Sequence, residues 1–294
     1  MNDGLMKGAG LFLEGGAMRG IFTAGVLDAF QEEGIYFPKM AAISAGTLQA
    51  VCYAARQPGR NRRINLDYSG DPRYMGFSHL FRGGSYFNFR FMFGELAHEL
   101  DPFDYETFAH APEELFAVIT ECASGRPVFI SSRSRGVEDF MKVCEASCSI
   151  PLFSQPVSVD GADYVDGGVG MPLAPLPGEF PFSCRKPVYI LTRDAAYRKK
   201  PAPRMLWWLM DAKYGRRYPA VADGMCSIPE RYNARLERLL RLEAAGEVFV
   251  IRPERPVRVS RVEKDQEKLD ALYREGFSLG KRRLEEMRAW LHEA

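Results

Sequence analysis

Short apolar runs alternate with segments of helical periodicity in the first 55 residues of the chain. Residues 10–14 form an apolar run that predicts a buried strand, and residues 19–34 follow with apolar positions at helical spacing. The same order repeats over residues 39–44 and 46–55. Two successive strand–turn–helix units predict a parallel sheet with helices packed on its faces.

The later part of the chain carries the same kinds of signal around one long exception. Residues 56–110 lose clear periodicity and are rich in Gly, Arg and aromatic residues, which is typical of a lid or binding loop. We therefore expect one α/β domain over residues 1–294, with a lid or insertion around 56–110 and a helical C-terminal part around 203–294. Strands are expected over 115–123, 127–131, 187–192 and 247–253, and helices over 136–147, 229–245 and 269–291.

Composition fits an ordinary globular protein and indicates no overall attraction to nucleic acid or to an acidic partner. The 294 residues are 46% hydrophobic and 26% charged, with a formal net charge of +1. We expect no nucleic-acid partner, because the one basic cluster, residues 56–63, lacks the interleaved aromatic residues of a nucleic-acid platform. That cluster is interpreted as a solvated loop, with a site for lipid headgroups or other phosphates as the alternative. The oligomeric state cannot be predicted from the sequence.

Targeting and redox signals favour the cytoplasm. The first residues lack the basic and apolar regions of a signal peptide, and no run reaches the roughly 18 apolar residues of a transmembrane helix. The six cysteines show no CxxC pair, and Cys144 and Cys148 have no second pair of ligands after them. We expect reduced, mostly buried thiols, no metal site and no cofactor.

The segment Leu11–Gly20, "LFLEGGAMRG", predicts a strand, a glycine loop and the entry of a helix. Such a loop holds an anion, either a cofactor phosphate or an oxyanion that develops during a reaction. A dinucleotide site would need G-x-G-x-x-G and an acidic residue at the end of the second strand. Here position 17 is Ala and the second strand ends in Ser44, and a Walker lysine is absent. The oxyanion interpretation is therefore favoured.

Ser44 stands between a predicted strand and a predicted helix in "AAISAGT". A sharp turn there would lift the side chain above the strand ends, next to the positive end of the helix, and would need small neighbours. On its own this string fits a helix N-cap serine better than a nucleophile. Asp166, in "ADYVDGGVGMP", follows a short apolar run and precedes two glycines, which places it at a strand end or in a hairpin turn.

Together the three stretches resemble the signature motifs of the patatin-like phospholipases: a glycine-rich oxyanion loop, a nucleophile elbow and an Asp-Gly-Gly motif. The resemblance extends over nearly the whole chain, including "SCSIPLFSQPVSVDGADYVDGG" and "RYNARLERLLRLEAAGEVFVIRPERPV". It implies a three-layer α/β/α fold with a mainly parallel sheet. Two positions depart from the pattern, Ala17 in the loop and Ala42 in the elbow. An alanine at either position is strained by roughly 1–2 kcal/mol if its φ is positive, and costs almost no free energy if its φ is negative.

The resemblance implies a Ser-Asp dyad that cleaves acyl esters of lipids through an acyl-enzyme. Ser44 is then the nucleophile, Asp166 the proton acceptor, and Arg19 orients the loop unless it is a surface charge. The implied oxyanion loop is Gly15, Gly16, Ala17, Arg19 and Gly20; the elbow is Ala42, Ala45 and Gly46; and the Asp-Gly-Gly motif adds Gly167 and Gly168. A triad is disfavoured because only His292 follows Asp166.

Two groups of aromatic residues suggest contact with lipid. The first lies in the lid region (Phe77, Phe81, Tyr86, Phe87, Phe89, Phe91 and Phe93) and is expected to line the substrate pocket. The second, Trp207 and Trp208 beside Lys213, Arg216 and Arg217, fits either the inner membrane surface or a core helix with a basic end. A non-catalytic or weakly active lipid-binding protein on the same fold stays open as the alternative function.

Overall fold

A central eight-stranded sheet organises the computed structural model, which describes residues 6, 8–82 and 84–292 (side chains of 81 and 82 excepted). The strand order is β5-β6-β3-β2-β1-β7-β8, and β4 pairs with β3 outside this path. The strands are β1 (Ala9–Leu13), β2 (Lys39–Ile43), β3 (Glu114–Glu121), β4 (Pro127–Ser131), β5 (Val157–Val159), β6 (Ala162–Asp166), β7 (Lys186–Ile190) and β8 (Phe249–Ile251).

The pairing of β3, β2, β1, β7 and β8 is parallel, whereas β4, β5 and β6 form antiparallel pairs at one side. The predicted mainly parallel sheet is therefore confirmed.

The helices are α1 (Ile21–Glu32), α2 (Ala45–Ala54), α3 (Arg60–Asp67), α4 (Phe77–Arg82), α5 (Phe89–Phe93), α6 (Tyr105–Ala109), α7 (Val137–Ser147), α8 (Gly167–Gly170), α9 (Arg204–Met210), α10 (Pro219–Cys226), α11 (Ile228–Ala244), α12 (Gln266–Arg282) and α13 (Leu284–His292), with short turns η1 (Ala17–Gly20), η2 (Leu96–Leu100) and η3 (Asp211–Gly215).

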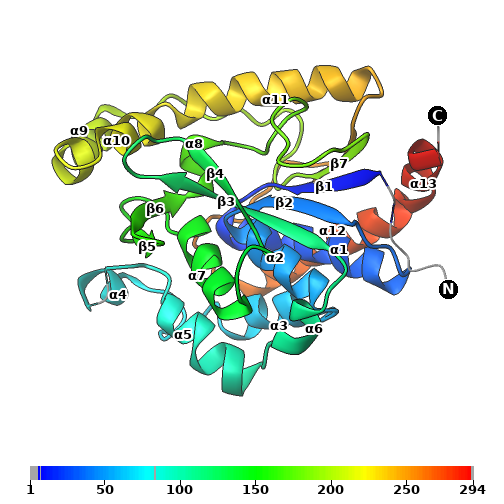
Figure 1. Ribbon diagram of the computed structural model, residues 1–294, viewed down its shortest axis with the longest axis horizontal. Coiled ribbons are helices and arrows are strands. Elements are labelled where there is room, and N and C mark those ends of the chain that lie inside the picture. The colour runs from blue at the N-terminus through cyan, green and yellow to red at the C-terminus, as the bar shows by residue number, and fades with distance from the viewer. Residues whose placement is uncertain (1–5, 7, 83, 293–294) are drawn as a thin grey trace.

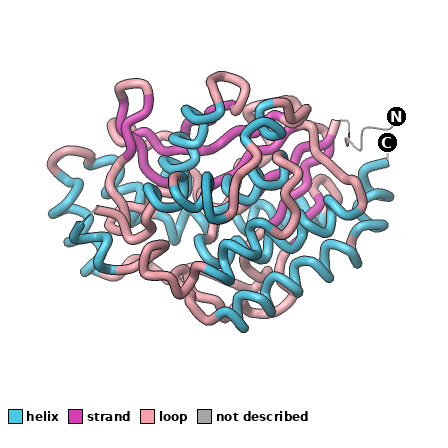
Figure 2. The backbone as a smooth tube through the Cα atoms, turned by 90° about the horizontal axis from the view of Figure 1, so that it is seen from below, coloured by secondary structure: helices cyan, strands magenta, loops and turns pink. Residues whose placement is uncertain are grey.

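Helices cover both faces of the sheet, as Figures 1 and 2 show. Alternate residues of each parallel strand point to opposite faces. Leu11 and Leu13 of β1 pack with α1, α2, α7 and α12 in the larger core, whereas Phe12 packs in the smaller core with Tyr232 and Leu236 of α11. The predicted three-layer α/β/α architecture is confirmed.

Two glycines let α1 and α12 cross in backbone contact, although they lie near opposite ends of the chain. A Cβ on Gly25 would lie 2.2 Å from the carbonyl oxygen of Tyr273, and one on Gly276 would lie 2.1 Å from that of Phe22. Any side chain at either position would therefore separate the helices. This contact joins the segment that follows the glycine loop to the C-terminal part of the fold.

The region 56–110 is more regular than its sequence predicts. It contains the helices α3, α4, α5 and α6 and the turn η2, which the loss of periodicity there did not predict. These helices are short, and Phe91 and Phe103 bury their rings in the large core. Such helices depend on tertiary packing, which local periodicity does not report.

The basic cluster at residues 56–63 is not the solvated loop that was expected. It leads into α3, and its arginines are paired with carboxylates of other segments. Arg56 pairs with Glu113 at 2.5 Å, and Arg62 pairs with Asp270 of α12 at 2.6 Å. Arg60 and Arg63 both pair with Asp101, at 3.4 and 2.8 Å. The cluster ties the 56–110 region to the rest of the domain.

The C-terminal part also differs in detail from the prediction. The expected helix over 269–291 is divided at Arg283 into α12 and α13. Strand β8 lies within this part and extends the central sheet beside β7.

All six cysteines are free thiols, and five of them are buried. Among the residues described, no helix is both long and apolar enough to cross a membrane.

Candidate active site

Ser44 occupies the sharp turn between β2 and α2. Its backbone has φ 52° and ψ −128°, and a non-glycine residue at positive φ is strained by about 1–3 kcal/mol. The N–H of Ser44 donates to Oγ of Ser147 at 2.9 Å, and that hydroxyl donates to the carbonyl of Val118 at 2.7 Å. These bonds hold the strained turn. The helix that begins at Ala45 directs its positive end toward the Ser44 side chain.

Small residues let the turn pack tightly against its neighbours. A Cβ on Gly46 would lie 2.9 Å from the carbonyl oxygen of Leu13, and one on Gly20 would lie 3.1 Å from Cβ of Ala45. Ala42 lies within β2, in extended backbone, and is fully buried. Its methyl group therefore brings no backbone strain, and the first departure from the family pattern costs little.

The glycine loop follows β1 and lies directly against Ser44. The register pairs Leu13 with Ala42, so the two strands end side by side. A Cβ on Gly15 would lie 2.8 Å from Cβ of Ser44, and one on Gly16 would lie 2.8 Å from Oγ1 of Thr192. Only glycine fits these contacts.

The loop presents free backbone donors. Within the part of the chain that the structure describes, the N–H groups of Gly15, Gly16 and Ala17 have no acceptor. Ala17 has φ 50°, so the second departure from the family pattern is strained. Arg19 is only 7% exposed and therefore is not a surface charge. Its N–H donates to the carbonyl of Gly16 at 3.2 Å, which tightens the loop.

Asp166 reaches the same place from the other side of β3. Ile43, just before Ser44, pairs with Val118, and Asp166 pairs with Ile119 at the end of β6. Close packing holds this strand end, since a Cβ on Gly167 would lie 2.2 Å from the carbonyl oxygen of Val118. The topology thus brings together two residues that are far apart in the sequence.

The Asp166 carboxylate is buried and only half satisfied. Oδ1 accepts the N–H of Gly168 at 2.7 Å, whereas the buried Oδ2 accepts no hydrogen bond from the described residues. Burial raises the pKa of Asp166 to about 6, opposed by the nearby Ser44 hydroxyl and by the hydrogen bond from the Gly168 N–H. A carboxyl group of this pKa beside a hydroxyl is suited to general-base catalysis at neutral pH.

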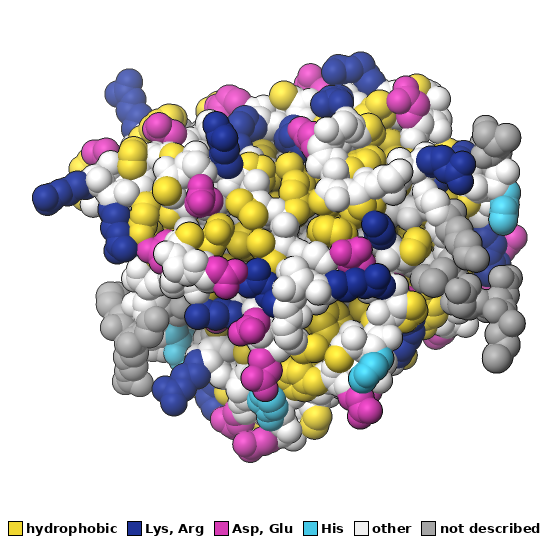
Figure 3. All heavy atoms as spheres, in the orientation of Figure 1, with side chains coloured by type: hydrophobic (Ala, Val, Ile, Leu, Met, Phe, Trp, Pro, Cys, Tyr) yellow, Lys and Arg dark blue, Asp and Glu magenta, His cyan; other side chains and the backbone are white. Residues whose placement is uncertain are grey.

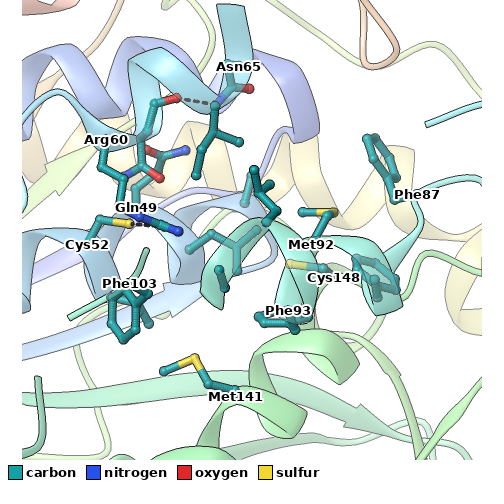
Figure 4. A pocket seen from close by; sticks show the side chains of 18 of the residues that line it. Gln49, Cys52, Arg60, Asn65, Phe87, Met92, Phe93, Phe103, Met141 and Cys148 are labelled. Atoms are coloured by element: carbon teal, nitrogen blue, oxygen red, sulfur yellow. Dashed lines mark hydrogen bonds between the residues drawn. The ribbon is translucent and has the colours of Figure 1, made fainter. Parts of the chain in front are cut away.

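Two cavities meet at Ser44, and they differ in chemistry. Ser44, Ala17 and Ile150 line both of them. The first is lined mainly by apolar side chains from α2, α3, α5 and the segments around them (Figure 4). Its empty space, counted together with its open mouth, is about 940 Å³.

The predicted aromatic lining is partly present. Figure 4 shows Phe87, Phe93 and Met92 around the apolar cavity, facing Phe103 and Met141 from other segments. Among the remaining lid aromatics, Phe89 lines the cavity, Tyr86 and Phe91 are buried outside its lining, Phe77 is 66% exposed, and the side chain of Phe81 lies outside the described residues. Trp207 and Trp208 do not line it and are 48% and 69% exposed.

The second cavity contains functional candidates that the sequence analysis missed. Besides Glu14, Arg19 and Asp166, it is lined by Arg193 and Lys199 from the segment after β7, and by Arg261 from the segment after β8. No motif marks these residues, because they come from loops that meet only in the folded chain. The glycine loop and the carboxyl ends of parallel strands were the available signal for a cavity there.

The described part of the chain offers no sign of a metal or histidine site. It has no group of three or more His, Cys, Asp or Glu side chains placed to hold a metal ion. The four histidines all lie outside the linings of the two cavities that meet at Ser44.

Comparisons with known proteins identify one family over more than half of the chain. Residues 11–177, more than half of the chain, match the model of the family described as patatin-like phospholipase. Residues 218–292 match a domain of unknown function, DUF6363. An uncharacterized protein of Escherichia coli (strain K12), YjjU, is 27% identical over 164 residues, which are 54% of this chain and 45% of that protein. The chain thus spans less than half the length of this curated relative. A crystal structure of VipD from Legionella pneumophila is similar with a TM-score of 0.45 and 12% identity, covering 95% of this chain and 67% of that one.

Proposed function

Because this chain belongs to the patatin-like phospholipase family, we propose that it is a serine hydrolase that cleaves acyl esters of lipids through Ser44 and Asp166. One observation carries the proposal. Ser44, at strained positive φ, lies against a loop with free N–H groups and lines the same cavity as a buried carboxylate with an unpartnered oxygen. A helix N-cap serine would need none of these three features.

The first half-reaction transfers the acyl group to the enzyme. Asp166 takes the proton of the Ser44 hydroxyl while Oγ forms a bond to the ester carbonyl carbon. The negative charge then develops on the carbonyl oxygen. As the tetrahedral intermediate collapses, the bond to the alcohol oxygen breaks, and that oxygen takes the proton from Asp166. The alcohol leaves, and Ser44 carries the acyl group.

The second half-reaction restores the enzyme. Asp166 takes a proton from a water molecule, whose oxygen attacks the acyl carbon of the acyl-enzyme. Collapse of this intermediate breaks the bond to Oγ of Ser44, which regains its proton from Asp166. The acid is released, and no cofactor is consumed in either step.

Backbone groups are proposed to stabilise the charge in both intermediates. The N–H groups of Gly15, Gly16 and Ala17 have no acceptor among the described residues, and they lie in the loop that packs on Ser44. Because these donors are already in place, no free energy is spent on reorganising them during the reaction. One such donor typically stabilises the transition state by about 3–4 kcal/mol. The positive end of α2 adds to the same field.

The apolar cavity is proposed to take the acyl chain. It opens at Ser44 and is lined mostly by Leu, Ile, Met, Phe and Tyr side chains. An acyl chain in water gains about 0.8 kcal/mol for each CH₂ group that it buries. The cavity therefore favours a long chain over an acetyl group.

Labelling with a fluorophosphonate tests the nucleophile. The Ser44 oxygen displaces fluoride from phosphorus, so the mass of the intact protein should rise by one phosphonyl group. We expect the adduct on the wild type and on Ser149→Ala, a matched buried serine whose hydroxyl only donates to the carbonyl of Glu145. We expect none on Ser44→Ala, and labelling slowed by about 100-fold or more in Asp166→Asn.

Two results would contradict this proposal. An adduct that persists in Ser44→Ala would place the nucleophile elsewhere. A folded wild-type protein that takes no adduct would favour the alternative, a non-catalytic lipid-binding protein on the same fold. Hydrolysis of a series of esters of rising chain length then tests the acyl-chain assignment, which fails if acetyl esters are preferred.

A further inference from the structure

The apolar cavity extends away from Ser44 along the helices α2 and α7. Helix α2 begins just after Ser44, and its residues from Ala45 to Cys52 contribute to the lining. Helix α7 ends at the same point, where Oγ of Ser147 accepts the N–H of Ser44 at 2.9 Å. Met141, which also lines the cavity, lies six residues before Ser147 on α7, or about 9 Å along the helix axis. Met141 therefore belongs to the part of the cavity away from the nucleophile.

Three side chains separate this part of the apolar cavity from an outer cavity. Phe93, Tyr105 and Met141 line both cavities, and we call these three residues the end wall. Phe93 and Met141 lie in the lower part of Figure 4. The boundary between the two cavities is thus only one layer of side chains thick. Beyond the end wall, the lining of the outer cavity is polar and consists of His98, Glu138, Lys142 and Glu145.

The members of the end wall differ in how firmly they are held. The ring of Tyr105 stacks on His98 with 5.1 Å between the ring centres, and its hydroxyl oxygen lies 3.3 Å from Nε2 of His98. The edge of Phe103 packs against the same ring at 4.9 Å. Met141 is buried, with 8% of its surface exposed, but its side chain is unbranched and has three rotatable bonds. The size of Met141 therefore decides how far a chain in the apolar cavity can extend.

The end wall also divides two environments of different polarity. Each CH₂ group that an acyl chain buries on the apolar side raises its affinity by about fourfold. A CH₂ group beyond the wall would lie beside the charged side chains of Glu138, Lys142 and Glu145 and would displace water from them, which is unfavourable. Extension of the chain is therefore favourable up to the wall and unfavourable beyond it.

We propose that Met141 sets the upper length of the acyl chain that this protein accepts. The inference rests on the proposed function, because it places the ester carbonyl at Ser44 and the methyl end of the chain at the end wall. The substrates are then esters with a chain long enough to reach Met141 and too short to pass it. Met141 is a specificity-determining residue for the acyl part of the substrate.

Hydrolysis of p-nitrophenyl esters from butyrate to stearate tests this assignment. In the wild type we expect kcat/KM to rise with chain length, reach an optimum and then fall. Met141→Ala opens the end wall and joins the two cavities, so the longest ester should gain about tenfold relative to the wild-type optimum. Met141→Trp fills the end of the apolar cavity. Its optimum should move to shorter chains, and the longest ester should lose about tenfold or more.

The matched control is Met92→Ala. Met92 lines the apolar cavity but not the outer one, so this variant loses apolar contact without opening the end wall. We expect kcat/KM to fall by a similar factor for every chain that reaches Met92, with the optimum unchanged. Because a large-to-small change at Met141 leaves empty space and lowers stability, the opposite shift in Met141→Trp separates altered length selection from a damaged fold.

Binding of free fatty acids of the same lengths to Ser44→Ala, measured by calorimetry, needs no turnover. If no ester is hydrolysed but Ser44→Ala/Met141→Ala prefers a longer fatty acid than Ser44→Ala does, the length selection holds and the proposed hydrolysis fails. If esters are hydrolysed with the same optimum in the wild type, Met141→Ala and Met141→Trp, the inference is rejected and hydrolysis stands. An optimum that Met92→Ala moves as far as Met141→Ala does also rejects it.

Discussion

As the proposed general base, Asp166 must meet two opposed requirements. A general base must be ionised to accept a proton, but burial disfavours the ionised form. Its pKa of about 6 reflects burial, partly offset by the Ser44 hydroxyl and the Gly168 N–H. The carboxyl group is thus ionised at neutral pH and still basic enough to take a proton in the transition state.

The pH dependence of hydrolysis follows from this pKa. In the proposed mechanism only ionised Asp166 accepts the Ser44 proton, so kcat/KM should fall on the acid side with a midpoint near pH 6, and about tenfold for each further pH unit. The assay should use an uncharged ester, because such a substrate does not itself titrate in this pH range. A midpoint near 4, the ordinary value for a carboxyl group, would contradict the assignment of Asp166.

Two alanines stand where the family has glycine, and the structure predicts opposite effects for them. Ala17 has φ 50°, whereas Ala42 lies in extended β2 and is fully buried. In Ala17→Gly the loss of strain, about 1–2 kcal/mol, exceeds the added entropy of the unfolded chain, about 0.5–1 kcal/mol. We expect this variant to gain up to about 1 kcal/mol in free energy of unfolding.

Ala42→Gly is the matched substitution in a strand. This change relieves no strain, removes a buried methyl group and gives the unfolded chain more conformational entropy. The free energy of unfolding should therefore fall by about 1 kcal/mol or more. Urea unfolding of both variants measures whether each substitution raises or lowers the free energy of unfolding. A loss of stability in Ala17→Gly would mean that the left-handed backbone at residue 17 carries no strain.

At the scale of elements, α9 combines exposed apolar side chains with nearby positive charge. Met205 and Trp208 are each 69% exposed and Trp207 is 48% exposed, whereas Met210 is buried. Exposed basic residues surround the helix (Arg204, Lys213, Arg216 and Arg217). Figure 3 shows Lys and Arg side chains projecting at the left end of the molecule, where Figure 1 places α9. The alternative of a core helix with a basic end was therefore wrong.

We propose that α9 contacts an anionic membrane surface. Indole rings settle at headgroup depth, and each nearby cation adds about 1 kcal/mol on an anionic surface. Replacing both tryptophans in Trp207→Ser/Trp208→Ser should weaken binding to vesicles with anionic lipid by at least about tenfold. Sedimentation with vesicles measures this. Leu100→Ser, which removes another exposed apolar side chain, is the control, and an equal loss in that variant would refute a specific role for α9.

Elements with a strong local pattern were predictable from the sequence. The units of β1 with α1 and β2 with α2 lie within a few residues of their expected limits, because each has its own apolar period and a glycine boundary. In contrast, α3 is held by ion pairs such as Arg62 with Asp270. Contacts over such a sequence separation leave no local signal.

At the scale of the whole molecule, the same distinction divides the candidate site. Ser44, Asp166 and the glycine loop were found because their motifs are local and their order along the chain is informative. The positive φ of Ala17 and the cations Arg193, Lys199 and Arg261 were not predictable, since packing around two loops decides them. Sequence patterns thus indicated the proposed chemistry, and only the fold revealed the charge beside it.

The crossing of α1 and α12 also constrains how the protein is made. At roughly 5–20 residues per second, the ribosome completes α12 on the order of ten seconds or more after α1 emerges. During that interval the face of α1 around Gly25, which packs on Tyr273 in the finished fold, has no partner. Since α1 begins directly after the glycine loop, we expect a nascent chain without α12 to hold this loop less firmly against Ser44. The proposed activity is then expected to appear only after α12 has been synthesised.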